Sequence, residues 1–390
     1  MIRFVRNNLR HGVNATPFSR RQTQIVRRVH AMALGCGPTA LRELPGLARR
    51  LGVRAVLVKD ESTRFGLKAF KGLGGFYAMF RMICEALGLN PEETTPETLR
   101  MPAYRDRIRG MRFATTTDGN HGKGVSWAAG VFGCQARVFM PKGTVEVRAQ
   151  AIRDAGNAEV TITDMAYDDC VAWTCAMAKR EGWQLIQDTS WPDYERVPLW
   201  IMQGYTTLFF EAMAQMRALG HTEPTHLLLQ AGVGAMAGAV AGAALETCEA
   251  APFIVTVEAD EVACFYESFA ANDGRPHRAT GSGETIMAGL NCAVPCTLAW
   301  DILSGCAAGA FACGDEVSRR GMRLLSHENP PIVSGESGAV TAGLLDALAE
   351  PENRGLRDAL GLDEGSVVLL ISTEGDTDPE NYRRIVGMGD

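Results

Sequence analysis

Residues 64–75 read RFGLKAFKGLGG and place a lysine, Lys71, on a glycine-flanked turn after the strand-like run at 53–58. The neighbouring glycines lack side-chain bulk and permit unusual backbone angles, so this lysine can approach a bound carbonyl compound closely. Desolvation in a closed pocket increases the neutral, nucleophilic fraction of a lysine amine. The stretch therefore predicts a Schiff-base lysine, with a surface lysine at a helix start as the alternative.

Two further segments bear on that choice. Residues 115–122, TTTDGNHG, follow a strand-like run and precede an apolar run, and their polar groups at a helix start form a cradle for a carboxylate. Residues 227–239, LLLQAGVGAMAGA, run from an apolar strand through a glycine turn into a small-residue helix, which is an arrangement that holds a phosphate on backbone amides. One glycine turn is a weak signal, but a lysine turn, an Asn loop (117–122) and a phosphate turn in this order are a strong one.

This order resembles the pyridoxal-phosphate enzymes of the tryptophan-synthase-β type (fold type II), which include serine and threonine dehydratases and cysteine synthases. From about residue 18 to the C-terminus, the chain resembles the diaminopropionate ammonia-lyase family in particular. The strings that carry this resemblance are FGL and FK within 65–71, TDGNHG (117–122), QDTSW (187–191), WIMQGY (200–205), TIMAGL (285–290), SGESGA (334–339) and ISTEGDTD (371–378).

The resemblance implies an α/β fold of two lobes with pyridoxal 5'-phosphate between them. The larger, cofactor-binding lobe would comprise residues 1–75 and 212–390, and the smaller inserted lobe, 76–211, would carry the Asn loop. The alternation of apolar runs and helical patterns independently predicts mainly parallel sheets covered by helices. The expected strands are 53–58, 112–116, 136–140, 159–163, 184–187, 227–230, 253–257 and 367–371, and the expected helices include 145–155, 168–180, 199–219 and 315–326. Residues 90–106, rich in Pro, Glu and Thr, are expected to form a surface excursion.

The family pattern Ala-Phe-Lys-x-x-Gly-Gly assigns the Schiff base to Lys71. Lys68 is the competitor, because it lies three residues earlier in the same turn. The family usually has a small polar residue at position 68 and tends to have proline at Ala40, so both positions are departures. A second cation near Lys71 would help to lower its pKa.

Two aspartates are candidate catalytic bases. Asp118 could cap the following helix, but the dehydratases carry a small neutral residue there, and a carboxylate becomes useful when it attracts a cationic side chain or removes a proton. Asp188 alone is typical of a loop aspartate that closes a turn. The resemblance implies that the two lie on opposite faces of the substrate, with Asp118 serving the D isomer and Asp188 the L isomer.

The resemblance also assigns contacts around the cofactor and the substrate. Asn120 would hydrogen-bond the cofactor's ring hydroxyl, and Ser372 or Thr373 would contact its ring nitrogen. Glu336 would flank the ring, with a solvated loop glutamate as the alternative. The phosphate would lie on the backbone of Gly232, Val233, Gly234, Ala235 and Met236, and the substrate carboxylate on Thr117, Gly119 and His121.

These parts imply the elimination of ammonia from 2,3-diaminopropionate to give pyruvate and a second ammonia. An aspartate would remove the α-proton, and a protonated group would assist the departing β-amine. The alternatives are a dehydratase or lyase of serine, threonine or a 3-hydroxy amino acid, and an idle metabolite sensor. A dinucleotide-binding oxidoreductase is a further alternative, but no early G-x-G-x-x-G turn with a later acidic residue is present.

Composition limits the possible partners. The chain has 390 residues and a net charge of -6, which favours neither nucleic acid nor an acidic membrane, and no apolar run approaches a membrane span. Its eleven cysteines lack zinc-ligand spacing, although Cys264 could pair with Cys292 or Cys296. Residues 1–42 hold eight arginines and no acidic residue, as transit peptides do, yet the family resemblance from residue 18 favours a mature, cytoplasmic start. The family precedent is a homodimer with a small amino-acid substrate.

Overall fold

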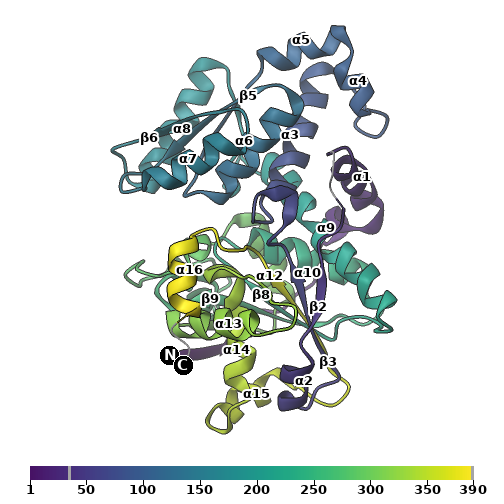
Figure 1. Cartoon of the computed structure of the whole chain (residues 1–390), viewed down its shortest axis with the longest axis vertical. Helices are drawn as coiled ribbons and strands as arrows, with labels where there is room; N and C mark the ends of the chain where they lie inside the picture. Colours follow the sequence, from purple (N-terminus) through teal and green to yellow (C-terminus); the bar gives the residue numbers. More distant parts are fainter. Residues whose placement is uncertain (34–36, 388–390) are drawn as a thin grey trace. The chain divides into compact units, whose positions relative to one another are not determined.

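The computed structural model describes residues 1–33 and 37–387, and the chain divides into two compact units. Unit 1 comprises Met1–Arg20, Pro38–Arg64 and Leu208–Asp390, and unit 2 comprises Arg21–Gly37 and Phe65–Thr207. Each unit is built around one sheet, and many of their helices and strands are labelled in Figure 1. Both sheets are mainly parallel and covered by helices, so the predicted fold class is confirmed.

The sheet of unit 1 has the strand order β1-β10-β9-β8-β11-β3-β2, in which the five inner strands are parallel and the two edge strands are antiparallel. The central strands are largely apolar and almost entirely buried, as expected for a parallel sheet with both faces covered. The strands are β1 (Ile2–Arg6), β2 (Leu41–Glu43), β3 (Ala55–Asp60), β8 (His226–Gln230), β9 (Phe253–Ala259), β10 (Gly309–Cys313) and β11 (Val367–Ser372).

The strand order of unit 1 determines which face of its sheet each crossover helix covers. Right-handed crossovers put the helices between β8, β9 and β10 on one face, and those between β10 and β11 on the other, because the chain reverses direction across the sheet. The first group is α10 (Ala235–Thr247), α11 (Cys264–Ala271) and α12 (Thr297–Cys306), and the second includes α13 (Asp315–Ser326) and α14 (Glu336–Leu348). The remaining helices are α2 (Pro45–Leu51), α15 (Arg354–Leu360) and α16 (Pro379–Val386).

The sheet of unit 2 is fully parallel, with the order β6-β5-β4-β7. The same crossover rule puts α6 and α7 on one face and α8 on the other. The elements are β4 (Arg112–Thr116), β5 (Gln135–Met140), β6 (Ala158–Ile162) and β7 (Gln184–Leu185), with α1 (Arg20–Ala31), α3 (Gly72–Leu87), α4 (Pro96–Arg100), α5 (Pro102–Gly110), α6 (Asn120–Phe132), α7 (Glu146–Ala155) and α8 (Tyr167–Glu181). Helix α9 (Arg196–Ala218) contributes residues to both units.

Most expected elements are present, and three strands were missed. β1, β2 and β10 gave no clear signal because they are basic, very short and built of small residues, respectively. Residues 90–106 form the expected surface excursion, since only Thr94 and Leu99 in this range are buried, and the excursion contains α4 and the start of α5. Pro96 and Pro102 occupy the first turns of these helices, where a missing N–H costs no hydrogen bond.

The structure groups Lys71 with the Asn loop in unit 2, whereas the expected boundary at residue 75 put it in the larger lobe. The reason is a close approach of two helices, since α3 packs directly on α6. A Cβ at Gly124 would lie 2.9 Å from the Cα of Gly72, so only glycine permits this spacing.

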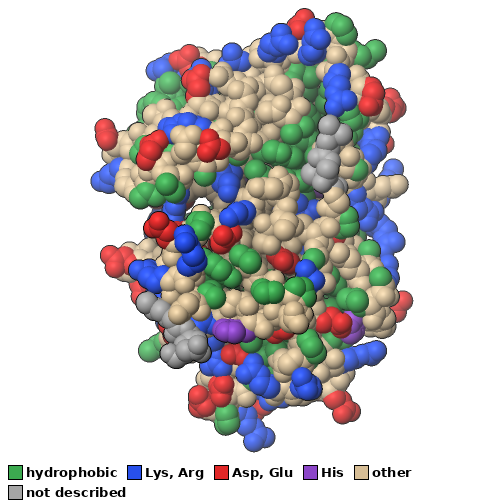
Figure 2. Space-filling model, viewed as in Figure 1, with side chains coloured by type: hydrophobic (Ala, Val, Ile, Leu, Met, Phe, Trp, Pro, Cys, Tyr) green, Lys and Arg blue, Asp and Glu red, His purple; other side chains and the backbone are tan. Residues whose placement is uncertain are grey.

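The surface agrees with the modest net charge. Figure 2 shows Lys and Arg side chains interspersed with Asp and Glu on the face in view. Within residues 1–33 and 37–387, no helix combines the length and the apolar character that crossing a membrane requires.

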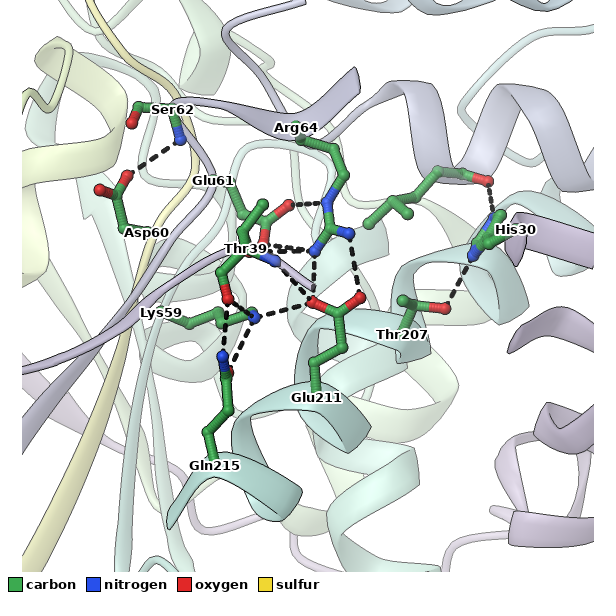
Figure 3. Close-up of polar contacts among 11 residues, drawn as sticks. His30, Thr39, Lys59, Asp60, Glu61, Ser62, Arg64, Thr207, Glu211 and Gln215 are labelled. Carbon is green, nitrogen blue, oxygen red and sulfur yellow. Dashed lines mark hydrogen bonds and ion pairs between the residues drawn. The ribbon is translucent and has the colours of Figure 1, made fainter. Parts of the chain in front are cut away.

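Unit 1 contains a buried charge cluster, drawn in Figure 3. The guanidinium of Arg64 bonds both carboxylate oxygens of Glu61 at 2.7 and 2.8 Å and both oxygens of Glu211 at 3.0 and 2.7 Å. Lys59 adds an ion pair of 2.7 Å with Glu211, so two positive charges face two negative charges. The members of the cluster are Thr39, Lys59, Glu61, Arg64, Glu211 and Gln215.

We expect Glu211→Gln to destabilise the protein by about 3–5 kcal/mol, because it leaves a buried positive charge without its partner. Urea unfolding followed by circular dichroism measures this change. Glu85→Gln is the matched control, since it breaks the exposed pair with Arg196 and should cost less than about 1 kcal/mol. Similar midpoints for the two variants would contradict the prediction.

Candidate active site

Lys71 immediately precedes α3, and the structure brings its amine to Asp188. The Nζ of Lys71 lies 2.5 Å from Oδ2 of Asp188, and both side chains are mostly buried. Lys68 is exposed and has a left-handed backbone, with φ of 57°. Of the two lysines, Lys71 is therefore the one held within the candidate site.

The Asn loop and the segment with Asp188 meet because of the sheet order. β4 ends at Thr116 and β7 at Leu185, and the two strands are parallel neighbours at the point where the strand order reverses. Ligands of parallel α/β sheets bind outside the carboxyl ends of strands at such a point. The topology of unit 2 thus explains why residues about 70 positions apart in the sequence converge.

Thr117 organises the Asn loop through its hydroxyl group. Its Oγ1 accepts hydrogen bonds from the backbone N–H groups of Gly119 at 3.0 Å and of Gly122 at 3.1 Å. Gly119 is the N-cap of α6, has φ of 154° and offers no side chain, so Asp118 does not cap this helix. Asn120 is the first residue of α6 and is partly buried. The carboxylate of Asp118 is therefore left for another role.

His121 is buried and acts as a hydrogen-bond donor. Its Nε2 lies 2.8 Å from the carbonyl oxygen of Ile186, which can only accept, so we assign the proton to Nε2. Its Nδ1 lies 3.7 Å from Oδ2 of Asp188. Burial lowers the pKa of His121, which keeps the ring neutral in this position.

The two aspartates have different acidities. Burial would raise the pKa of Asp188, but the positive charge of Lys71 and its hydrogen bond to the carboxylate outweigh this effect and hold the pKa well below its usual range. Desolvation raises the pKa of Asp118 to about 6 against the attraction of Arg148, and the negative charge of Asp188 adds to the rise. Asp118 is an exposed residue, and its contact with solvent weakens this rise. Two carboxyl groups with separated pKa values can divide acid and base roles.

Unit 1 contains the predicted phosphate turn between β8 and α10. Gly234 is the N-cap of α10 with φ of 86°, and no side chain caps the helix, so its first backbone N–H groups are available to an anion. A Cβ at Gly234 would lie 2.4 Å from the ring of Phe265, and one at Gly232 would lie 3.1 Å from the backbone of Leu290. These two glycines therefore allow the turn to pack closely. The turn comprises Gly232, Val233, Gly234, Ala235 and Met236.

Ser372 and Thr373 lie at the carboxyl end of β11, the parallel neighbour of β8. Ser372 donates to Oγ of Ser334 at 2.7 Å, and Gln230 donates to Oγ1 of Thr373 at 3.3 Å. Unit 1 thus brings these hydroxyl groups to the same edge of its sheet as the phosphate turn. Glu336 begins α14, is buried and accepts from Asn381, so the solvated-loop alternative for Glu336 is wrong. Burial raises the pKa of Glu336.

The structure corrects one cysteine pairing and adds a contact that the sequence did not signal. Cys264 is a buried thiol whose Sγ donates to the carbonyl of Gly232 at 3.5 Å, so it does not form the disulfide considered above.

Lys123 donates from Nζ to the carbonyl of Leu67 at 2.7 Å and ties α6 to the lysine turn. No motif marks Lys123, because a single lysine on a helix is common. In the described part of the chain, His, Cys, Asp and Glu side chains form no set that could hold a metal ion.

Comparison with known proteins identifies the family. The model of the pyridoxal-phosphate dependent enzymes matches residues 32–373. The chain is 46% identical to the diaminopropionate ammonia-lyase of Escherichia coli K12 over 388 residues, which covers 98% of this chain and 96% of that protein. The chain belongs to the diaminopropionate ammonia-lyase family. The predicted family is thereby confirmed.

Solved structures of the same family agree with this assignment. The holo diaminopropionate ammonia-lyase of Escherichia coli has a TM-score of 0.92 at 45% identity and covers 100% of this chain and 97% of that chain. The same enzyme in complex with an aminoacrylate-PLP azomethine reaction intermediate has a TM-score of 0.90 at 44% identity, with coverages of 100% and 98%. The family assignment therefore holds along the whole chain.

Each unit, taken by itself, has a feature that suits part of the family's cofactor, pyridoxal phosphate. Unit 2 supplies a mostly buried amine at Lys71 for its carbonyl carbon. Unit 1 supplies an uncapped helix N-terminus behind Gly234 for its phosphate. The neutral hydroxyl of Ser372 suits the ring nitrogen of a cofactor used for elimination, because it leaves the ring less electron-withdrawing than a carboxylate partner would.

Proposed function

We propose that Lys71, Asp118 and Asp188 carry out the elimination of ammonia from 2,3-diaminopropionate in this chain. The chain is a pyridoxal-phosphate-dependent carbon–nitrogen lyase, and the products are pyruvate and two ammonia. The observation that carries the residue assignment is the 2.5 Å pair of Lys71 and Asp188, next to a second aspartate with a raised pKa. Unit 2 thus contains the proposed Schiff-base lysine and both proposed bases.

When bound, pyridoxal phosphate supplies a carbonyl carbon that reacts with amines and a ring that takes up the electron pair left on the α-carbon when its proton is removed. Lys71 provides the amine that holds the cofactor. Gly232, Val233, Gly234, Ala235 and Met236 hold its phosphate on backbone N–H groups, Asn120 bonds its ring hydroxyl, and Ser372 or Thr373 bonds its ring nitrogen, with Glu336 beside the ring.

The Asn loop binds the substrate carboxylate through Thr117, Gly119 and His121. Asp188 stays ionised at neutral pH because its pKa is near 2, so it can accept the α-proton of the L isomer. Asp118 is proposed to accept the α-proton of the D isomer from the opposite side. With a raised pKa it can also be protonated near neutrality and assist an amine that leaves poorly unless it is protonated.

The test is to measure pyruvate and ammonia from purified, cofactor-loaded protein with D- and L-2,3-diaminopropionate and with L- and D-serine. Two ammonia per pyruvate from both diaminopropionate isomers, with slower turnover of serine, is the expected result. Faster turnover of serine or threonine would identify the alternative, a dehydratase of hydroxy amino acids, and Lys68 would then be the first residue to replace.

We also propose that the protein is a cytoplasmic homodimer, as the family resemblance implies. Size-exclusion chromatography with light scattering tests the oligomeric state, and a mass near the 42.1 kDa of one chain would reject it.

A further inference from the structure

The backbone pairing between β7 and β4 ends just before Asp188. Gln184 and Leu185 pair with Phe113 and Ala114, and the N–H of Ile186 bonds the carbonyl of Ala114 at 2.9 Å. The chain then leaves the sheet, although β4 continues to Thr116. The last residue of β4 therefore needs another partner on this side.

The side chain of Gln187 takes the place of the missing strand residue. Its Oε1 accepts from the N–H of Thr116 at 2.9 Å, and its Nε2 donates to the carbonyl of Thr116 at 3.0 Å. Oε1 also accepts from the hydroxyl of Thr115 at 3.1 Å. A primary amide presents an N–H donor and a carbonyl acceptor side by side, as the backbone N–H and C=O of a paired strand residue do. Gln187 is only 1% exposed, so leaving these groups unpaired would be costly.

The main chain of Gln187 is fixed as well. Its N–H donates to the hydroxyl of Tyr194 at 2.8 Å, and that hydroxyl donates to the carbonyl of Leu185 at 3.1 Å. Tyr194 thereby closes the loop that starts at Asp188, the next residue along the chain. Both the backbone and the side chain of residue 187 are thus held directly before the carboxylate that pairs with Lys71.

The Asn loop does not depend on Gln187 in the same way. Thr116 also pairs with Phe139 of β5, and the N–H of Thr117 bonds the carbonyl of Phe139 at 3.1 Å. The hydroxyl of Thr117 then orders the loop around Asp118 by itself. Loss of the Gln187 amide should therefore displace Asp188 and leave Asp118 largely in place.

We propose that Gln187 is a positioning residue that holds Asp188 against Lys71 and thereby supports turnover of the L isomer. This proposal rests on the proposed function, in which Asp188 is the base for that isomer. A catalytic group displaced by about 1 Å can cost on the order of 100-fold in rate. The change that removes the amide pairing should therefore affect the two isomers unequally.

The experiment compares the cofactor-loaded wild type with Gln187→Leu and with Gln135→Leu as the matched control. Gln135 lies at the start of β5, and its side chain bonds only the exposed Glu159 among the described residues. We expect Gln187→Leu to lower kcat for the L isomer about 10-fold or more and for the D isomer by less than about threefold. The control should retain both activities. Equal losses on the two isomers, or no loss, would overturn the proposal.

A second variant keeps the proposal testable if Gln187→Leu fails to fold. Gln187→Glu keeps the shape and the acceptor but loses the donor to the carbonyl of Thr116 when it is ionised. It should give the same imbalance between isomers, at smaller amplitude and with unchanged far-UV circular dichroism. Wild-type rates on both isomers at a pH at which the introduced carboxyl group of a folded Gln187→Glu variant is ionised would contradict the proposal.

A double-mutant cycle separates this proposal from the base assignment. The readout is the pH midpoint at which the visible absorbance of the Lys71-bound cofactor changes. If Gln187 acts through Asp188, Gln187→Leu should shift the midpoint in the direction of Asp188→Asn and add nothing in that background. Independent, additive shifts would overturn the positioning role. If instead Asp188→Asn affects both isomers alike, the base assignment fails while the cycle still decides on Gln187.

Discussion

Lys71→Ala is expected to abolish the visible absorbance of bound pyridoxal phosphate and to reduce turnover of diaminopropionate on the order of 10⁴-fold or more. The reason is that Lys71 alone of the two candidate lysines is mostly buried and paired with Asp188, at 2.5 Å. The measurement is an absorbance spectrum after reconstitution with the cofactor and removal of the excess, followed by a pyruvate assay on the same sample.

Lys68→Ala is the matched control for this variant. Lys68 lies in the same turn but is exposed, so its replacement should preserve the cofactor spectrum and most of the activity. Lys68 has a left-handed backbone conformation, which alanine adopts only at some cost. Circular dichroism should therefore confirm that the Lys68→Ala variant is folded. Loss of the spectrum in Lys68→Ala and its retention in Lys71→Ala would reverse the assignment of the Schiff-base lysine.

Much of this fold could be predicted because many of its strands and helices have a clear local sequence pattern. Apolar runs such as His226–Gln230 and Val367–Ser372 are central parallel strands, and both were expected within one residue. The strand Gly309–Cys313 escaped because GAFAC has few of the β-branched residues that mark strands. The excursion at 90–106 was expected at the surface and lies there, but the two short helices that Pro96 and Pro102 start within it were not predicted.

The candidate site was predictable as a set of residues but not as a geometry. The motifs around Lys71, Asp118 and Asp188 were visible, since each string is specific to the family. The sequence could not show that Gly119, and not Asp118, is the N-cap of α6, because both are acceptable caps. Nor could it show that the Gln187 side chain completes a sheet, since that depends on where a neighbouring strand ends. Contacts between segments that are distant in the sequence depend on the tertiary structure, and a single sequence does not reveal them.

The acidity of the two aspartates predicts different pH profiles for the two isomers. A general base works in its ionised form, so its activity is lost as the pH falls through its pKa. With the pKa of Asp118 raised to about 6, kcat/KM for the D isomer should fall below about pH 6. With the pKa of Asp188 near 2, the L isomer should keep its activity to lower pH. Identical profiles would show that one shared group limits both reactions.

Asp188→Asn is expected to lower kcat for the L isomer by about 10²–10⁴-fold and for the D isomer by less than about 10-fold. The amide keeps the shape of the side chain but cannot accept the α-proton. The D isomer is expected to lose some activity too, because Asp188 also holds the amine of Lys71. Asp118→Asn is the reciprocal control and should reverse the order of the losses. Equal losses in either variant would reject two bases on opposite faces, since each isomer presents its α-hydrogen to a different side of the cofactor plane.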